Sequence, residues 1–181
     1  MSPAPPQRVL LMGMMGAGKT TVGAALSKRT GWPYLDNDTL VARAGGRSTD
    51  KVLDEEGVGT LRDLESRALT EALRAPAPVI AAVAGGIVDS DDDRRRLAAG
   101  GFVVWLRARI ETLAQRVGTG EGRPWFHEGD DVATALRRLY DGRADRYAAV
   151  ASYIVDVDDL SPDEIADRIF TAMSDERPED R

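Results

Sequence analysis

The chain of 181 residues has no cysteine and a single histidine. The lack of cysteine excludes disulfide bonds, thiolate metal sites and cysteine nucleophiles, and it fits a reducing compartment. No run of residues approaches the roughly 18 consecutive apolar residues of a membrane span. The first residues, MSPAPPQ, lack the apolar core of a signal peptide. We therefore expect a cytoplasmic protein with no membrane association.

Basic residues are outnumbered as well, with 24 Lys and Arg against 30 Asp and Glu, for a formal charge of −6. A general nucleic-acid binder is normally basic, so we expect no nucleic-acid partner. Local basic clusters can still bind a small phosphorylated molecule. With 43% hydrophobic residues the chain can bury a sizeable core. We expect one domain, 1–181, that is a monomer and either an enzyme or a binding module.

Apolar runs alternate with helical patterns along the chain. Strand-like runs lie at 8–13, 33–36, 79–84, 102–107 and 153–157. Helical spacing of apolar residues marks 19–30, 59–74, 91–99, 110–117, 131–150 and 162–173. This alternation predicts an α/β fold with a largely parallel sheet.

The segment 118–130, GTGEGRPWFHEGD, breaks this rhythm with four glycines and one proline. It also carries Trp125 and Phe126, which are costly to leave exposed. A mobile lid that closes over a ligand would reconcile the two features. The alternative is a surface loop that tucks both aromatic rings onto the body, and we interpret His127 as a solvated loop residue.

The segment 13–20, GMMGAGKT, fits the pattern G-x-x-x-x-G-K-[ST] between a strand and a helix. Its glycines let backbone N–H groups point inward as an anion nest, and the helix N-terminus adds partial positive charge. Lys19 would bridge the terminal phosphates and the Thr20 hydroxyl would bind Mg²⁺. The motif therefore predicts a nucleoside triphosphate site, with ATP as the default.

A second acid for the cation is expected after a later strand. The run 79–84 ends in Ala-Gly-Gly and offers no carboxylate, whereas 34–38 reads YLDND. On an extended segment the side chains of Asp36 and Asp38 point the same way, so both can face the phosphate loop. One could hold hydrated Mg²⁺ while the other meets the phosphoryl acceptor. The alternative is that Asp38 only caps the helix that follows.

Three arginines stand out among the basic residues. Arg62 has Glu65 three residues on, a spacing at which the two side chains can pair on a helix. Arg143 lies four residues before Tyr147, a spacing that predicts one helical face for both, and Arg123 lies in the predicted lid. Arg62 and Arg143 together suit an acceptor that carries a carboxylate, and a lid arginine suits the developing phosphoryl charge. Alternatively, each is a solvated surface arginine.

Together these segments resemble the shikimate kinase family from about Val9 to Met173. The matching pieces, in family order, are LLMGMMGAGKTTVG, YLDND, AGGRSTDKVLDEEGVGTLRDLE, AGGIV, GRPW and RADRYAAVA. The resemblance implies a three-layer α/β sandwich with a five-stranded parallel sheet, a P-loop kinase with a mobile lid. It implies transfer of phosphate from ATP, with Mg²⁺, to a hydroxyl of shikimate, giving shikimate 3-phosphate and ADP.

The resemblance also implies a role for each matching residue. The catalytic residues would be Lys19, Asp38 and Arg123. ATP would contact Gly16, Ala17, Gly18, Lys19, Thr20, Thr21, Arg116 and Arg123, and Mg²⁺ would lie at Thr20 and Asp36. Shikimate would contact Asp38, Arg62, Gly85, Gly86 and Arg143, with a substrate-binding region at about 37–75. Glu65 would orient Arg62.

Several positions depart from the family pattern. Ala84 replaces the first glycine of a triplet that is usual in the family, and Leu61 replaces an aromatic residue. Thr49 stands where an apolar residue is usual, and Leu53 where phenylalanine is common. The lid reads RPWF where two leucines are common. These changes reshape pocket walls and remove no charge, so a related polyhydroxy acid such as gluconate stays open as the acceptor. A nucleoside monophosphate kinase is disfavoured because the acceptor region has few aromatic residues, and a nucleotide-dependent switch without an acceptor is a further alternative.

Overall fold

The computed structural model describes residues 7–118 and 131–175. Its strands are β1 (Arg8–Met12), β2 (Tyr34–Leu35), β3 (Val79–Ala82), β4 (Phe102–Arg107) and β5 (Tyr153–Asp156). They form one five-stranded sheet in the order β2-β3-β1-β4-β5, and every neighbouring pair is parallel. All five strand-like runs of the sequence therefore form strands, and the predicted parallel sheet is confirmed.

The central strand β1 explains why its sequence is a continuous apolar run. Leu10 is paired with Ala81 of β3 on one side and with Val103 of β4 on the other. All three side chains are fully buried, because helices cover both faces of the sheet. Parallel strands buried on both faces show no alternation of apolar and polar residues.

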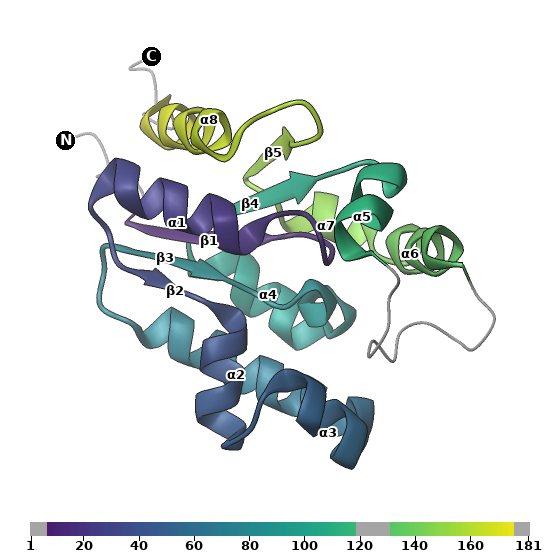
Figure 1. The fold of residues 1–181 in the computed structure, drawn as a ribbon. Helices are drawn as coiled ribbons and strands as arrows, with labels where there is room; N and C mark the ends of the chain where they lie inside the picture. The colour runs from purple at the N-terminus through teal and green to yellow at the C-terminus, as the bar shows by residue number, and fades with distance from the viewer. Residues whose placement is uncertain (1–6, 119–130, 176–181) are drawn as a thin grey trace.

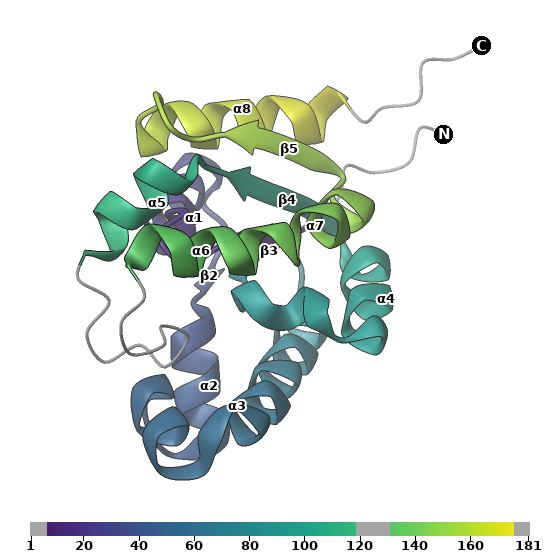
Figure 2. The same cartoon turned by 90° about the vertical axis from the view of Figure 1, so that its right-hand side faces the viewer.

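Helices cover the sheet on both sides, so the fold has three layers (Figures 1 and 2). On one side α1 (Lys19–Thr30) packs against α8 (Pro162–Asp175). On the other side α4 (Asp91–Gly100) and α7 (Ala144–Val150) pack against β4. The remaining helices are α2 (Asn37–Gly45), α3 (Thr49–Arg74), α5 (Ile110–Val117) and α6 (Val132–Asp141), and a 3₁₀ segment, η1, spans Gly85–Asp89.

Two helix boundaries differ from the sequence-based expectation. The single helix expected over 131–150 is wrong, because the chain turns at Gly142 and Arg143 between α6 and α7. The helix expected over 59–74 starts earlier, at Thr49. Within it Gly57 has a left-handed φ of 84°, which separates two helical halves. A residue with a side chain rarely adopts this conformation, so the glycine permits the kink.

The carboxyl ends of parallel strands lie at one edge of a sheet, where open α/β folds bind their ligands. Here the loop after β1, the start of α2 after β2, and η1 after β3 all leave from this edge. Helices α2 and α3 pack together beyond the same edge (Figures 1 and 2). Most of the predicted lid lies outside the described residues. Among the residues described, no helix has the length and apolar character needed to cross a membrane.

Candidate functional site

The loop between β1 and α1 has the backbone geometry of a phosphate nest. Gly16 and Gly18 have left-handed φ angles of 80° and 95°, which only glycine adopts without strain. The N–H of Ala17 donates to the carbonyl of Met14 at 3.1 Å, so this amide already closes the turn. Helix α1 begins at Lys19 and directs its N-terminus at the loop.

Lys19 lies along the inner side of this loop. Its Nζ donates to the carbonyls of Gly13 and Met14 at 2.9 and 3.2 Å. Burial lowers the pKa of this ammonium to about 8, although the nearby carboxylates of Asp38 and Glu65 act in the opposite direction. A buried ammonium is suited to an anionic ligand, which would raise its pKa again.

Asp36 is the N-cap of α2 and the centre of a hydrogen-bond cluster. Its Oδ1 accepts from the N–H groups of Asp38 and Thr39 at 3.0 and 3.4 Å. Its Oδ2 accepts from the hydroxyls of Thr20 and Tyr34, both at 3.0 Å. The capping residue is therefore Asp36, and the alternative in which Asp38 caps this helix is wrong.

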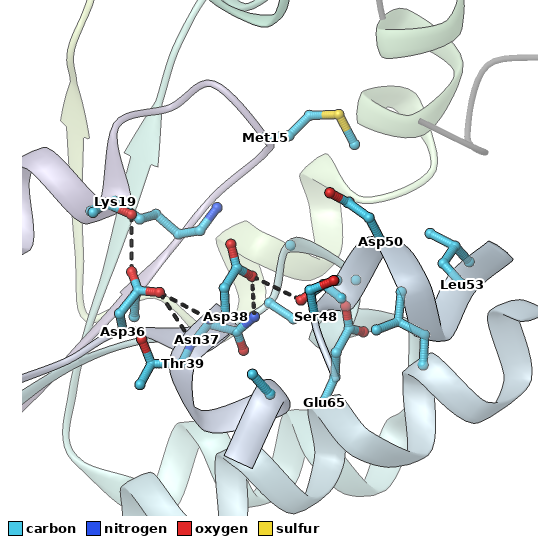
Figure 3. A pocket seen from close by; sticks show the side chains of 18 of the residues that line it. Met15, Lys19, Asp36, Asn37, Asp38, Thr39, Ser48, Asp50, Leu53 and Glu65 are labelled. Carbon is cyan, nitrogen blue, oxygen red and sulfur yellow. Dashed lines mark hydrogen bonds between the residues drawn. The ribbon is translucent and has the colours of Figure 1, made fainter. Parts of the chain in front are cut away.

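The two acids also do not share one extended segment. Strand β2 ends at Leu35, and Asp38 already belongs to the first turn of α2. The helical turn, not strand alternation, sets the relative positions of the two carboxylates. Both nevertheless line the same cavity as Lys19, and Figure 3 shows Asp38 facing the space in front of Lys19.

Tyr34 is a site residue that the sequence pattern did not reveal. Its ring lies against α1 at Gly23, where an added Cβ would come within 2.2 Å of the ring. Burial raises the pKa of its hydroxyl, which therefore stays a donor to Asp36. The signal available in the sequence was a small residue inside α1 that leaves room for an aromatic ring.

The residues predicted to hold Mg²⁺ fit that cation. The Thr20 hydroxyl and the Asp36 carboxylate lie 3.0 Å apart beside the phosphate loop. Both are oxygen donors, and Mg²⁺ prefers oxygen ligands, usually one or two from protein and the rest from phosphates and water. Thr20 is exposed and so is accessible to a bound cation.

A cavity of about 990 Å³ extends from the phosphate loop to α3. It brings together almost all of the residues predicted from the sequence. These are Gly16, Gly18, Lys19, Thr20, Thr21, Asp36, Asp38, Arg62, Gly85, Gly86, Arg116 and Arg143. Ala17 does not line it, and Arg123 lies outside the described residues.

Arg62 and Glu65 form the ion pair that their spacing predicted. Glu65 is buried on α3, and burial raises the pKa of its carboxyl, opposed by the charge of Arg62. Asp38 lies nearby, with its Oδ1 at 3.5 Å from the Thr49 hydroxyl and 3.3 Å from the amide nitrogen of Asn37. Figure 3 shows Asp38 and Glu65 at the same cavity, with Leu53 on its α3 side.

Arg143 is buried, and one edge of its guanidinium is bound by a carboxylate. Its Nε and Nη2 donate to the two carboxylate oxygens of Asp89 at 3.1 and 2.7 Å. Burial lowers the pKa of this guanidinium, but the hydrogen bonds to Asp89 and the charges of Tyr147, Asp89 and Glu65 together outweigh burial, so the pKa is raised. Arg143 precedes α7 as its N-cap, so the expectation that it lies on a helical face with Tyr147 is wrong.

The two glycines after β3 are close to other parts of the protein. A Cβ on Gly85 would lie 3.1 Å from the carbonyl of Gly13 in the phosphate loop. A Cβ on Gly86 would lie 1.9 Å from Nη1 of Arg62. The Tyr147 hydroxyl donates to the Gly85 carbonyl at 2.6 Å and fixes this turn. The glycines therefore let the phosphate loop and an arginine approach the backbone closely.

Arg116 lies at the nucleotide end of the cavity. It comes from the last turn of α5, and its Nη1 donates to the carbonyl of Gly16 at 3.2 Å. This contact holds the guanidinium over the phosphate loop, where the sequence resemblance places a nucleotide contact.

Comparison with known proteins agrees with this geometry. A family model described as shikimate kinase matches residues 15–174. The shikimate kinase of Moorella thermoacetica is 35% identical over 170 residues, which cover 93% of this chain and 95% of that protein. The shikimate kinase of Ruegeria pomeroyi is 34% identical over 166 residues, 92% of this chain and 84% of that one.

Solved structures give the same result. A shikimate kinase from Acinetobacter baumannii in complex with shikimate matches with a TM-score of 0.88 and 28% identity, over 95% of each chain. A gluconokinase from Sinorhizobium meliloti matches with a TM-score of 0.66 and 21% identity, over 94% of this chain and 93% of that chain, a likeness that shows the fold alone. The chain belongs to the shikimate kinase family and is an ATP-dependent kinase that transfers phosphate to a hydroxyl group.

Proposed function

We propose that the chain uses ATP and Mg²⁺ to phosphorylate the 3-hydroxyl of shikimate, giving shikimate 3-phosphate and ADP. One observation carries the proposal. A single cavity is lined by a phosphate loop with Lys19, by Arg62 and Arg143, and by Asp38. Such a cavity suits an acceptor with a hydroxyl to be phosphorylated and a carboxylate to be held.

Each end of the cavity has a distinct task in this proposal. Lys19 and the loop amides bind the phosphates, and Thr20 and Asp36 hold Mg²⁺. When bound, the cation offsets phosphate charge and orients the terminal phosphoryl group. Arg62 and Arg143 bind the acceptor carboxylate and so fix the distance of the reacting hydroxyl from the phosphates.

Asp38 would accept the proton of the acceptor hydroxyl as its oxygen forms a bond to the terminal phosphorus. The bond from that phosphorus to the bridging oxygen breaks, and ADP leaves. Lys19 offsets the charge that spreads over the phosphoryl oxygens. Arg123 remains a prediction from the sequence for the same task.

Release of ADP tests the proposal. With ATP and Mg²⁺ we expect shikimate to stimulate ADP release far more than quinate or gluconate, and Lys19→Met to abolish that stimulation. Release that depends on gluconate and not on shikimate would assign the acceptor to a different polyhydroxy acid. Slow hydrolysis that no acceptor changes would favour a nucleotide-dependent switch.

A further inference from the structure

Asp89 ends the 3₁₀ segment η1 and contacts three guanidinium groups at once. Besides its two bonds to Arg143, its Oδ1 accepts from Nη1 of Arg146 at 3.2 Å. Its Oδ2 lies 3.6 Å from Nη2 of Arg62. One carboxylate therefore joins α3 and the start of α7 at the two arginines assigned to the acceptor. Neither the sequence motifs nor the resemblance pointed to Asp89.

The Asp89 carboxylate contacts these arginines from outside the cavity that they line. Arg62 and Arg143 line the cavity, whereas Asp89 and Arg146 do not. Asp89 occupies the fork formed by Nε and Nη2 of Arg143. A guanidinium has five N–H donors in a fixed plane, so Nη1 and one hydrogen of Nη2 are left on the other edge. Because the guanidinium is rigid and planar, hydrogen bonds that hold one edge also fix the direction of the opposite edge.

Charge makes such a partner necessary at this position. The Arg143 side chain is 9% exposed, and the Arg62 guanidinium carries the same charge nearby. A buried charge needs a hydrogen-bonded counter-charge, and two guanidinium groups repel each other. Glu65 supplies the counter-charge for Arg62, and Asp89 is the one that bonds Arg143 directly.

We propose that Asp89 is a positioning residue for the acceptor, and that its carboxylate holds Arg143, together with Arg62, in the orientation that binds the acceptor carboxylate. The inference rests on the proposed function, because it assigns both arginines to an acceptor that carries a carboxylate. A competing role would give the opposite result. If Asp89 drew the arginines away from the acceptor, its removal would strengthen acceptor binding.

Steady-state kinetics with two acceptors separate these roles. We expect Asp89→Ala to raise the KM for shikimate at least tenfold, with kcat changed less than threefold and the KM for ATP unchanged. Asp89→Asn retains one acceptor oxygen and should raise the KM less. With the methyl ester of shikimate, which has no carboxylate, the variant and the wild-type protein should differ little. An unchanged or lower KM for shikimate in Asp89→Ala overturns the proposal, and so does an equal rise for the ester.

Asp93→Asn is the matched control for general destabilisation. Asp93 is an aspartate whose side chain is 8% exposed, and it binds Arg96 at 2.7 Å and the Ser66 hydroxyl at 2.8 Å. It does not line the cavity. We expect its substitution to lower the melting temperature and leave the KM for shikimate unchanged. A similar KM rise in both variants would mean that the effect of Asp89 is only structural.

A second measurement tests Asp89 without any acceptor. In a ¹⁵N-labelled sample, the Nε–H signal of Arg143 is assigned by its loss in Arg143→Lys. We expect Asp89→Ala to speed the solvent exchange of this hydrogen at least tenfold, and unchanged exchange overturns the proposal. If the wild-type protein releases no ADP with shikimate, the proposed function fails while this measurement still decides the role of Asp89.

Discussion

Replacing Gly86 with alanine tests whether Arg62 is held in place for the acceptor. The φ angle of Gly86 lies outside the left-handed region, so alanine brings no backbone strain there. The added Cβ would lie 1.9, 2.1 and 2.2 Å from Nη1, Cζ and Nη2 of Arg62. Because carbon atoms do not approach within about 3 Å of such groups, the guanidinium must move by about 1 Å or more.

The size of the effect follows from what Arg62 loses by moving. Its guanidinium is bound to Glu65 and lies 3.6 Å from Asp89, so it cannot shift without weakening these contacts. A hydrogen bond to a charged group contributes about 1.5–3 kcal/mol. If one such bond to the acceptor carboxylate is lost, the KM for shikimate rises about tenfold to a hundredfold, since about 1.4 kcal/mol corresponds to tenfold.

The assay is steady-state ADP release with shikimate and ATP varied separately. We expect the KM for shikimate to rise and the KM for ATP to stay within twofold of the wild-type value. Gly59→Ala is the control, because Gly59 lies in α3 and an added Cβ there meets no atom within 4 Å. An unchanged KM for shikimate in Gly86→Ala would refute the reasoning. It would show that Arg62 moves freely or does not bind the acceptor.

Three further predictions address other parts of the cavity. Asp38→Asn should lower kcat at least a hundredfold and change the KM for ATP little, because general-base catalysis contributes about 10²–10⁴-fold; near-normal turnover would remove Asp38 from this role. The pKa of Lys19 is about 8 before ATP binds, and the bound phosphates should raise it. At pH 8 the protein should therefore take up about half a proton when ATP binds, and the affinity for ATP should fall as the pH rises further. Calorimetry in buffers of different ionisation enthalpy measures this uptake, and Lys19→Arg, which stays protonated, should show none. Ala84 is 5% exposed and lines the cavity; Ala84→Gly should raise kcat/KM for shikimate, and no change would exclude a role in shaping the pocket.

Local patterns in the sequence predicted the sheet and most of the cavity. The glycine pattern and lysine of residues 13–20, the acids of YLDND and the pairing of Arg62 with Glu65 each depend on residues close in sequence. Parallel strands bring such segments to one edge. The break between α6 and α7 also had a local signal, since Asp141 and Gly142 form a turn-type pair that the apolar periodicity overrode.

Contacts between distant segments could not be predicted in the same way. Asp89 lies 54 residues before Arg143, and only the packing of η1 against α7 brings them together. Tyr34 binds Asp36 because Gly23 of α1 leaves space for its ring. Asp89 lies outside the sequence motifs, and the only signal for the contact of Tyr34 is the small residue Gly23 in α1. The structure identifies both contacts, as it also identifies Asp36 as the cap of α2.

The glycine pair after β3 shows how such a contact changes an interpretation. A glycine pair at the end of an apolar strand predicts close approach of a ligand to bare backbone. Both glycines do line the cavity, but an added Cβ on Gly86 would first meet Arg62 and one on Gly85 would first meet Gly13 of the phosphate loop. The absence of a side chain therefore matters here even before an acceptor binds. It lets Arg62 and the phosphate loop lie against the same turn. This closeness places the proposed acceptor site and the proposed phosphate site within one cavity.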